Sequence, residues 1–403
     1  MAAVPAPGLA SGPRTGLRTK RYLGAAAGPK GPILTSLCLH LAPTAVDQHP
    51  YLGWCRRLVV PLLSLLLGGC ESLGYYWQAG EGQWRIYRAQ APVGELVDSP
   101  QTAPELRERL IRSQAILEFA HQSLLLPDNG SYRHYADLKR PYVVWNLFAS
   151  DEFSIQPHHW CYPLVGCLSY RGYFDPDSAI RAASRLQAQG MDTWVAGVRA
   201  YSTLGWLDDP LLNTFIEEPE QQLAELIFHE LAHQRVFAAG DTEFNESLAT
   251  VIADEGVRRW AALHHLPHNS EQAALERRAR EQVVALVKQT RERLDRLYRE
   301  DLPTASMRDQ KQRLLDQLRT EYQQLRLGPL QRHARYDRWM AGTLNNAKLA
   351  TIASYHRWVP QIEALLKQQG GDLDALYRAL EELAALSADK RKRVLSTHPK
   401  YNQ

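Results

Sequence analysis

The chain has 403 residues, of which 45% are hydrophobic, and its formal net charge is +3. This length and hydrophobic content allow one large core or two domains. The charge is too small to indicate a nucleic acid as partner, and no internal repeat indicates a solenoid.

The first recognisable pattern follows a stretch rich in Ala, Gly and Pro that shows no periodicity. A basic Arg56-Arg57 pair precedes an apolar run over residues 58–67, which ends in Gly68-Gly69-Cys70. This order is typical of a secretory signal peptide, and the apolar run is too short to span a bilayer. The alternative is a buried apolar helix beside a chance cysteine.

Leu67-Gly68-Gly69-Cys70 is similar to the lipobox of bacterial lipoproteins, in which the cysteine is diacylated and becomes the new N-terminus. A signal should lie at the start of the chain, and no methionine lies between Met1 and Met191. We therefore predict that translation begins near Leu52 at a non-Met codon and that residues 1–69 are removed.

Two cysteines, Cys161 and Cys167, remain after such processing. An even pair in an oxidising compartment favours a disulfide, and Pro163 and Gly166 allow the chain between them to bend back. The alternatives are two buried thiols, or a second zinc site formed with His158-His159.

Helix and strand patterns then follow in an order that predicts a mixed sheet. A helix begins near Thr102, and residues 142–148 are strongly β-prone. Residues 164–173, 177–189 and 193–201 have the patterns of a strand, an amphipathic helix and a second strand.

Residues 201–210, Tyr-Ser-Thr-Leu-Gly-Trp-Leu-Asp-Asp-Pro, connect this sheet to the next helix. The loop is aromatic and acidic, and Asp208 or Asp209 is a candidate for binding the amino group of a substrate. The alternative is a capped and solvated loop without such a role.

Residues 227–234, Ile-Phe-His-Glu-Leu-Ala-His-Gln, contain the motif on which the functional prediction depends. On a helix, His229 and His233 leave the same face one turn apart, which lets two imidazole nitrogens hold one Zn²⁺ at about 2.0–2.1 Å. Glu230 lies beside them, where its carboxylate can take a proton from a water that the metal activates. The alternative is a buried helix with two structural histidines.

A catalytic zinc takes a third protein ligand and keeps one position open. A third histidine, as in HExxHxxGxxH, is excluded because Val236 and Ala239 occupy the Gly and last His positions. A helix stop and restart at residues 238–242 places Glu246 in the early turns of a second helix, facing the histidines. The other acidic residues of that helix are Glu243, which is the rival ligand, Asp254 and Glu255.

The remainder of the chain is charged and predominantly helical. Residues 270–326 carry two apolar stripes separated by Pro303, which predicts an antiparallel helical hairpin. The histidines just before it, His264, His265 and His268, are expected at the surface.

A further helix is expected over residues 336–358, and its polar residues are unusual within an apolar pattern. Tyr355 or His356 is a candidate for donating a hydrogen bond to the oxyanion of the reaction, with structural polar packing as the alternative. An amphipathic helix over 373–386 and a solvated basic stretch, Lys390–Arg393, follow.

Several of these stretches together resemble the bacterial lipoproteins described as putative aminopeptidases. They are the lipobox, the loop over 201–210, the HExxH motif with Phe244-Asn245-Glu246, and the Leu-Asn-Asn-Ala sequence at 344–347. The resemblance extends from Cys70 to about Leu386 and implies a zinc metallopeptidase whose Asn-Glu resembles that of thermolysin-like gluzincins. The Gly-x-Met-Glu-Asn motif by which large gluzincin aminopeptidases bind a free amino terminus has no counterpart here.

The expected fold class is α+β. A zincin-like mixed sheet with the HExxH helix and a second ligand helix is expected over residues 99–268. A mostly helical region over 269–403, with the hairpin, completes the fold, and residues 70–98 are expected to form a lipidated tether and anchoring segment. In such a sheet an edge strand can bind an extended peptide.

The sequence thus predicts a peptide-bond hydrolase with one Zn²⁺ held by His229, His233 and Glu246, and with Glu230 as general base. A peptide is the expected substrate. The lipid on Cys70 would anchor the protein at the periplasmic face of the bacterial cell envelope, in the outer membrane. The alternative is a lipid-anchored periplasmic scaffold in which the metal is only structural.

Overall fold

The computed structural model describes residues 74–162, 166–200, 202–266, 270–328, 330, 331, 334, 336–355 and 357–397, without the side chains of 270–274, 276, 277 and 353–355. The predicted signal, translation start and lipidation of Cys70 fall outside the described residues. Within these ranges, none of the helices combines the length and the apolar character that a membrane span requires. The fold below is that of residues 78–397, which lie within a single unit.

Helices make up most of this fold, and most of its strands are short. The strands are β1 (Gln90–Pro92), β2 (His134–Ala136), β3 (Val144–Asp151), β4 (Trp160–Tyr162), β5 (Gly166–Leu168), β6 (Arg171–Tyr173), β7 (Met191–Val198) and β8 (Leu211–Leu212). The helices are α2 (Val93–Asp98), α3 (Pro104–Leu124), α4 (Pro176–Ala188), α5 (Glu220–Arg235), α6 (Thr242–Leu263), α7 (Ser270–Leu297), α8 (Thr304–Leu327), α9 (Asp337–Ala341), α10 (Asn346–Tyr355), α11 (Val359–Gln368), α12 (Leu373–Ala385) and α13 (Ala388–Thr397). Residues 78–88 are also helical.

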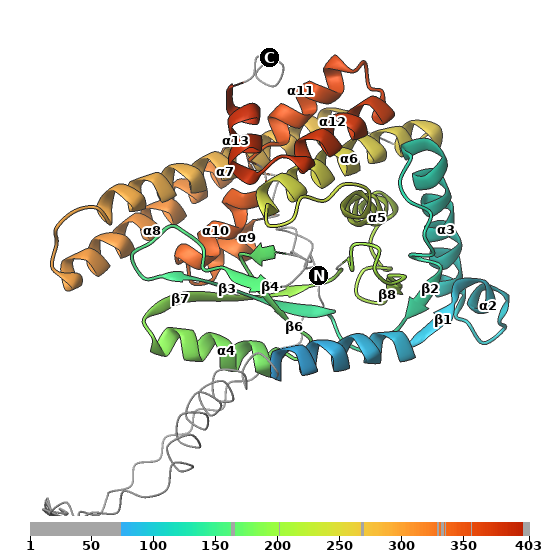
Figure 1. Ribbon diagram of the computed structural model, residues 1–403, viewed down its shortest axis with the longest axis horizontal. Coiled ribbons are helices and arrows are strands. Elements are labelled where there is room, and N and C mark those ends of the chain that lie inside the picture. The colour runs from blue at the N-terminus through green and yellow to red at the C-terminus, as the bar shows by residue number, and fades with distance from the viewer. Residues whose placement is uncertain are drawn as a thin grey trace, which may run out of the picture. The chain divides into compact units, whose positions relative to one another are not determined.

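The sheet with the longest strands has the order β6-β3-β7, and β3 runs antiparallel to both neighbours. The predicted strand, helix and second strand correspond here to β6, α4 and β7. The first predicted strand, over 164–173, is divided into β5 and β6, because β5 pairs with β4 in a separate ribbon. Helix α4 covers one face of the sheet and α10 the other (Figure 1).

Residues 78–98, expected to belong to a tether, are instead part of the fold. Ile86 is fully buried, and the backbone N–H of Phe174 donates to Gln78 Oε1 at 3.1 Å. Strand β1 then pairs with β2. The expectation of a tether extending to residue 98 is therefore wrong, because this segment carries apolar side chains that the core buries.

Helices α5 and α6 lie at the centre of the main hydrophobic core, with α3 packed beside them (Figure 1). The ring of Phe119 lies 5.9 Å from that of Phe228 and 5.2 Å from that of Trp260. Gly256 allows this close packing, since a Cβ at that position would lie 2.6 Å from the Phe228 ring. Helix α6 is buried from Phe244 to Ala253 because apolar side chains surround it on several sides.

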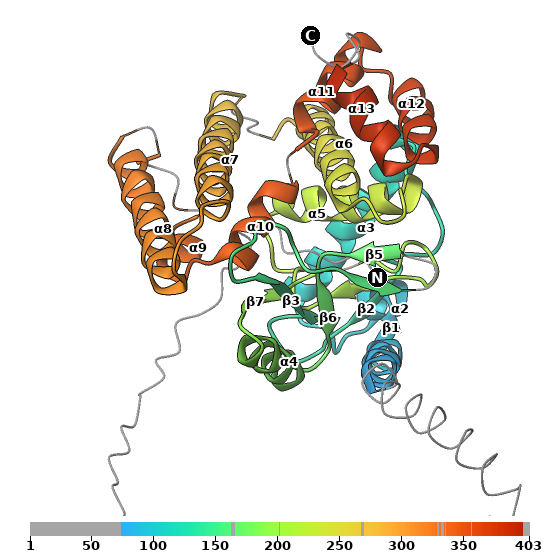
Figure 2. The ribbon, with the colours of Figure 1, turned by 60° about the vertical axis from the view of Figure 1, so that its left-hand side comes forward.

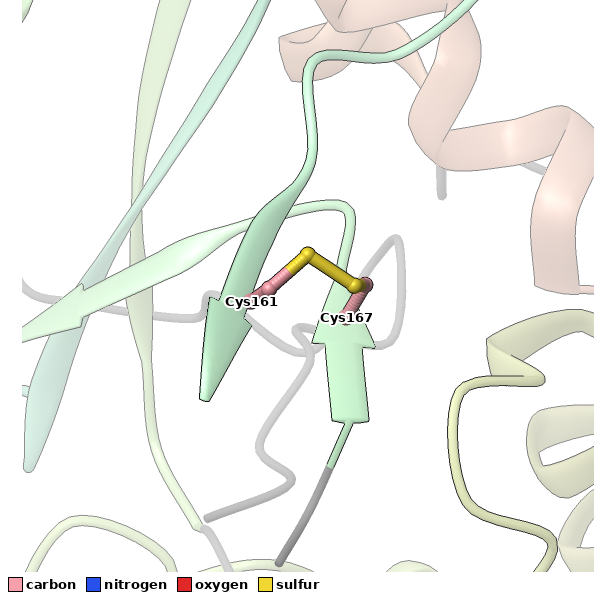
Figure 3. The surroundings of a disulfide bond; sticks show 2 residues. All are labelled: Cys161 and Cys167. Atoms are coloured by element: carbon pink, nitrogen blue, oxygen red, sulfur yellow. A yellow bond between two sulfur atoms is a disulfide. The ribbon is translucent and has the colours of Figure 1, made fainter. Parts of the chain in front are cut away.

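A disulfide between Cys161 and Cys167 joins β4 to β5 (Figure 3). Gly166 has φ 78°, and a Cβ there would lie 3.1 Å from the backbone nitrogen of Gly240. The ribbon therefore packs directly against the loop that connects α5 to α6.

Helices α7 and α8 form the predicted hairpin, which extends to one side of the sheet (Figure 2). The predicted stripe of α7 is buried and packs on α8, α9 and α10 in a second core. The Lys311 ammonium connects the hairpin to the sheet by donating to Asp192 Oδ2 at 2.6 Å and to the Glu152 carbonyl at 2.8 Å.

The single helix expected over 336–358 is wrong, because the chain leaves the helical conformation between α9 and α10. Asn345 Oδ1 accepts a hydrogen bond from the Lys348 backbone N–H at 2.9 Å, and Asn345 Nδ2 donates to the Thr193 carbonyl at 2.9 Å. The Asn346 N–H donates to Asp192 Oδ2 at 2.9 Å. The Asn-Asn pair thus begins a new helix and fastens it to β7, because asparagine side chains satisfy free backbone groups at helix starts.

The expectation that Lys390–Arg393 is solvated is wrong at Arg391, which is 2% exposed. This stretch lies in α13, which contacts the N-terminal end of α6. Arg391 Nε donates to Asp241 Oδ2 at 2.8 Å, and Nη1 donates to the carbonyls of Leu383, Ala384 and Leu386. These bonds account for the burial of a guanidinium, because a buried charge is stable only when paired and hydrogen-bonded.

Replacing Arg391 with Ala is expected to lower the free energy of unfolding by about 3–5 kcal/mol, because Asp241 would keep a largely buried charge without its partner. Urea denaturation of the full chain measures this change. Arg393→Ala is the matched control, since Arg393 is exposed on the same helix and should change stability by at most about 0.5 kcal/mol. An equal decrease in the free energy of unfolding in both variants would contradict the role given to Arg391.

Candidate metal centre

Helix α5 presents His229 and His233 on one face, and α6 brings Glu246 to the same point. The Nε2 atoms of the two histidines lie 3.2 Å apart. Glu246 Oε2 lies 3.3 Å from His229 Nε2, and Oε1 lies 3.6 Å from His233 Nε2. Ligands about 2.0–2.1 Å from a tetrahedral metal ion are separated by roughly 3.3 Å, so the three side chains have the spacing of a candidate metal site.

The two histidines differ in exposure and in protonation. The His229 side chain is 23% exposed, whereas those of His233 and Glu246 are 3% exposed, so the centre opens on the His229 side. Burial lowers the pKa of His233 to about 4, which leaves it in the neutral form that binds metals. Burial also acts to lower the pKa of His229, but its hydrogen bond to Glu246 and the nearby acidic charges raise it overall.

Asn245 explains how the short loop between α5 and α6 positions Glu246. Its side chain accepts from the Ala238 N–H and donates to the Ala238 carbonyl, both at 2.8 Å. Gly240 has φ 77°, which turns the chain, and Asp241 caps α6 by accepting from the Phe244 N–H at 3.0 Å. The Asn of the Asn-Glu pair therefore fixes the loop, and the Glu faces the histidines from the next position.

The other acidic residues of α6 form ion pairs away from the two imidazoles. Glu243 lies 3.3 Å from Arg357, and Asp254 lies 3.5 Å from Arg280. Glu255 contacts Arg258 and Arg259. Of the candidate third ligands, the structure brings Glu246 to the histidines.

Glu230 is 6% exposed and follows His229 on α5. Burial raises the pKa of its carboxyl to about 8, the charge of His229 acts to lower that pKa, and Glu246 raises it further. A cation held by the neighbouring ligands would lower the pKa toward the range in which a general base works at neutral pH.

The loop over 201–210 places its two acidic residues differently. Asp208 is exposed. Asp209 is 3% exposed and accepts from the Thr203 N–H at 2.9 Å and from Gln234 Nε2 at 3.1 Å, and burial raises its pKa to about 6. Asp209 therefore caps the loop, as the alternative expected, but it is buried and not solvated.

Gln234, which sequence reasoning did not single out, holds two loops on α5. Besides Asp209, its side chain contacts Asn129 Nδ2 at 2.8 Å and Ser131 Oγ at 3.3 Å. Its position directly after the HExxH motif, on the same helical face as Glu230, was the one signal available in the sequence.

The predicted oxyanion donors stay predictions. Tyr355 is the last residue of α10, but its side chain and the whole of His356 lie outside the described residues. Of the histidine cluster, His264 packs on Trp260 with ring centroids 3.8 Å apart, and His268 is not described.

A family model with the description "Putative aminopeptidase" matches residues 74–395, which is most of the chain. The chain belongs to this family. Membership in the putative aminopeptidase family indicates a peptidase, and the match includes both helices of the candidate metal centre. No curated protein and no solved structure match the chain.

Asn245→Ala is expected to lower the free energy of unfolding by about 2–4 kcal/mol, because the buried N–H and carbonyl of Ala238 lose their partners. Chemical denaturation tests this. Gln312→Ala, which removes an exposed side chain of α8, serves as control and should have little effect. An Asn245→Ala variant as stable as the wild type would contradict the positioning role of this residue.

Proposed function

We propose that this member of the family is a zinc-dependent peptide-bond hydrolase of zincin-like architecture. The observation that carries the proposal is the convergence of His229, His233 and Glu246 at the spacing of a tetrahedral metal site, with Glu230 beside them. Two imidazoles and one carboxylate form the ligand set of hydrolytic zinc sites, which keep a fourth position open.

When bound, zinc would polarise the scissile carbonyl and lower the pKa of a water that it coordinates. His233 and Glu246 would hold it from the buried side, and His229 from the more open side. A zinc-dependent site also suits the charges present, because two carboxylates and two imidazoles meet where little solvent screens them.

Glu230 would act as the general base. Its carboxylate would take the proton of the attacking water and later return it to the nitrogen of the leaving amine. The position of Glu230 next to His229 supports this role, since proton transfer requires the base within hydrogen-bond reach of the water. The carboxylate of Asp209, by contrast, already accepts hydrogen bonds from the Thr203 N–H and from Gln234 Nε2.

The proposal includes anchoring at the periplasmic face of the cell envelope through a lipid on Cys70. Its support is the sequence from Arg56 to Cys70, with basic residues, a short apolar run and small residues before a cysteine. The disulfide between Cys161 and Cys167 is consistent with an oxidising compartment.

Glu230→Gln is expected to keep bound zinc but to lower kcat by at least about 100-fold, because the base is lost while the ligands stay. Glu246→Ala is expected to lose more than about 100-fold in zinc affinity. Zinc content after dialysis and turnover of synthetic peptides measure both effects. Wild-type zinc affinity in Glu246→Ala would show that the ligand assignment is wrong.

Glu243→Gln is the matched control, because Glu243 lies one turn earlier on α6 and contacts Arg357 instead of the histidines. It should keep both zinc and activity. A chelator should abolish turnover by the wild type, and added Zn²⁺ should restore it. Unchanged turnover of unblocked and N-acetylated peptides after complete zinc removal would contradict the proposed function.

A further inference from the structure

Tyr132 carries a buried hydroxyl for which the described residues provide no hydrogen-bond partner. Its side chain is 2% exposed, and its backbone has φ 63°, a left-handed conformation that is unfavourable for a bulky residue. Two other buried tyrosines differ, since Tyr377 Oη donates to the Leu124 carbonyl at 2.8 Å and Tyr322 Oη to Asp337 at 2.6 Å.

The loop that carries Tyr132 is held on the face of α5 that bears Glu230. Gln234, one turn beyond Glu230, contacts Ser131 next to Tyr132. The Tyr132 N–H donates to the Asp209 carbonyl at 2.6 Å, which joins the same loop to the segment over 202–209. Burial raises the pKa of Tyr132 well above its usual value, and the charges of Glu230 and Asp209 raise it further.

Glu230 provides the complementary atom. Its Oε2 is buried and, among the described residues, also has no hydrogen-bond partner. A buried donor and a buried acceptor near each other are each costly when unpaired, and Phe at position 132 would avoid that cost. Two such atoms beside a catalytic motif indicate a contact that forms when the site works, because catalytic hydrogen bonds tighten in the substrate complex.

We propose that Tyr132 is a positioning residue for the general base: its hydroxyl donates a hydrogen bond to Glu230 Oε2, directly or through one water. The bond would fix the carboxylate so that its other oxygen faces the attacking water. The tyrosine keeps its proton throughout and does not contact the substrate. This inference rests on the proposed role of Glu230.

The test is Tyr132→Phe in the zinc-loaded full chain, assayed with a set of unblocked and N-acetylated synthetic peptides. Phe keeps the ring and the same backbone strain, so the substitution removes only the hydroxyl. We expect kcat to fall by at least about 10-fold, with KM within about 2-fold, because the base has lost its orientation. Zinc content should be unchanged, and the urea midpoint should fall less than in Tyr377→Phe, because the bond to Glu230 is weak until substrate binds.

Tyr377→Phe is the matched control, since it removes a buried hydroxyl whose partner is the Leu124 carbonyl and not a residue of the candidate metal centre. It should lower the urea midpoint and leave kcat unchanged. Wild-type kcat in Tyr132→Phe would overturn the proposal. A variant in which the urea midpoint, the zinc content and kcat all fall would also overturn the proposal, because a tyrosine with only a structural role would give that result.

A second measurement does not need activity. Tyr132→Phe, Glu230→Met and the double variant form a cycle in the urea midpoint, and the proposed bond predicts shifts that do not add. Additive shifts of the urea midpoint would contradict the proposed contact between Tyr132 and Glu230. If the wild type shows no zinc-dependent turnover, the proposed function fails, whereas a non-additive cycle would still support the contact between Tyr132 and Glu230.

Discussion

The packing of α6 against α5 is the constraint on which the candidate metal centre depends. A metal site requires its ligand atoms to lie within about 0.5 Å of their binding geometry. The candidate ligand atoms come from two helices joined by a short loop. Three devices fix that loop and its helix: the missing Cβ of Gly256, the double hydrogen bond of Asn245, and the cap by Asp241. Each acts on backbone position, so the scaffold sets the spacing of the two imidazoles and the Glu246 carboxylate.

Electrostatics at the centre follow from the same burial. Glu230 and Glu246 are almost completely removed from solvent, and one histidine is kept neutral while the other is held beside a carboxylate. The pKa values of both His229 and Glu230 are raised, so these two groups bind protons more tightly than in water. A divalent cation at the candidate centre would compete with these protons, which would make metal affinity dependent on pH.

Local sequence patterns were sufficient to predict those features that depend on residues close together in the sequence. The four-residue spacing of His229 and His233, the stop and restart before Glu246, and the stripes of the α7–α8 hairpin all follow from helix periodicity. Contacts between distant segments were not predictable in this way. The burial of Arg391 and the loops held by Gln234 depend on partners that only the folded chain brings together. The burial of the Tyr132 hydroxyl, for which the described residues provide no hydrogen-bond partner, was likewise visible only in the folded chain. The break before α10 has the same cause, because Asn345 and Asn346 bond to β7 and its Asp192.

The ion pair between Arg391 and Asp241 has a consequence for biosynthesis. Asp241 caps the helix that carries Glu246, yet its partner follows 150 residues later in the chain. During translation, the charge of Asp241 is therefore neutralised only after α13, which carries Arg391, has been synthesised. A nascent or C-terminally shortened chain would hold the ligand helix less firmly, so that the site would mature only late, when synthesis has passed that arginine.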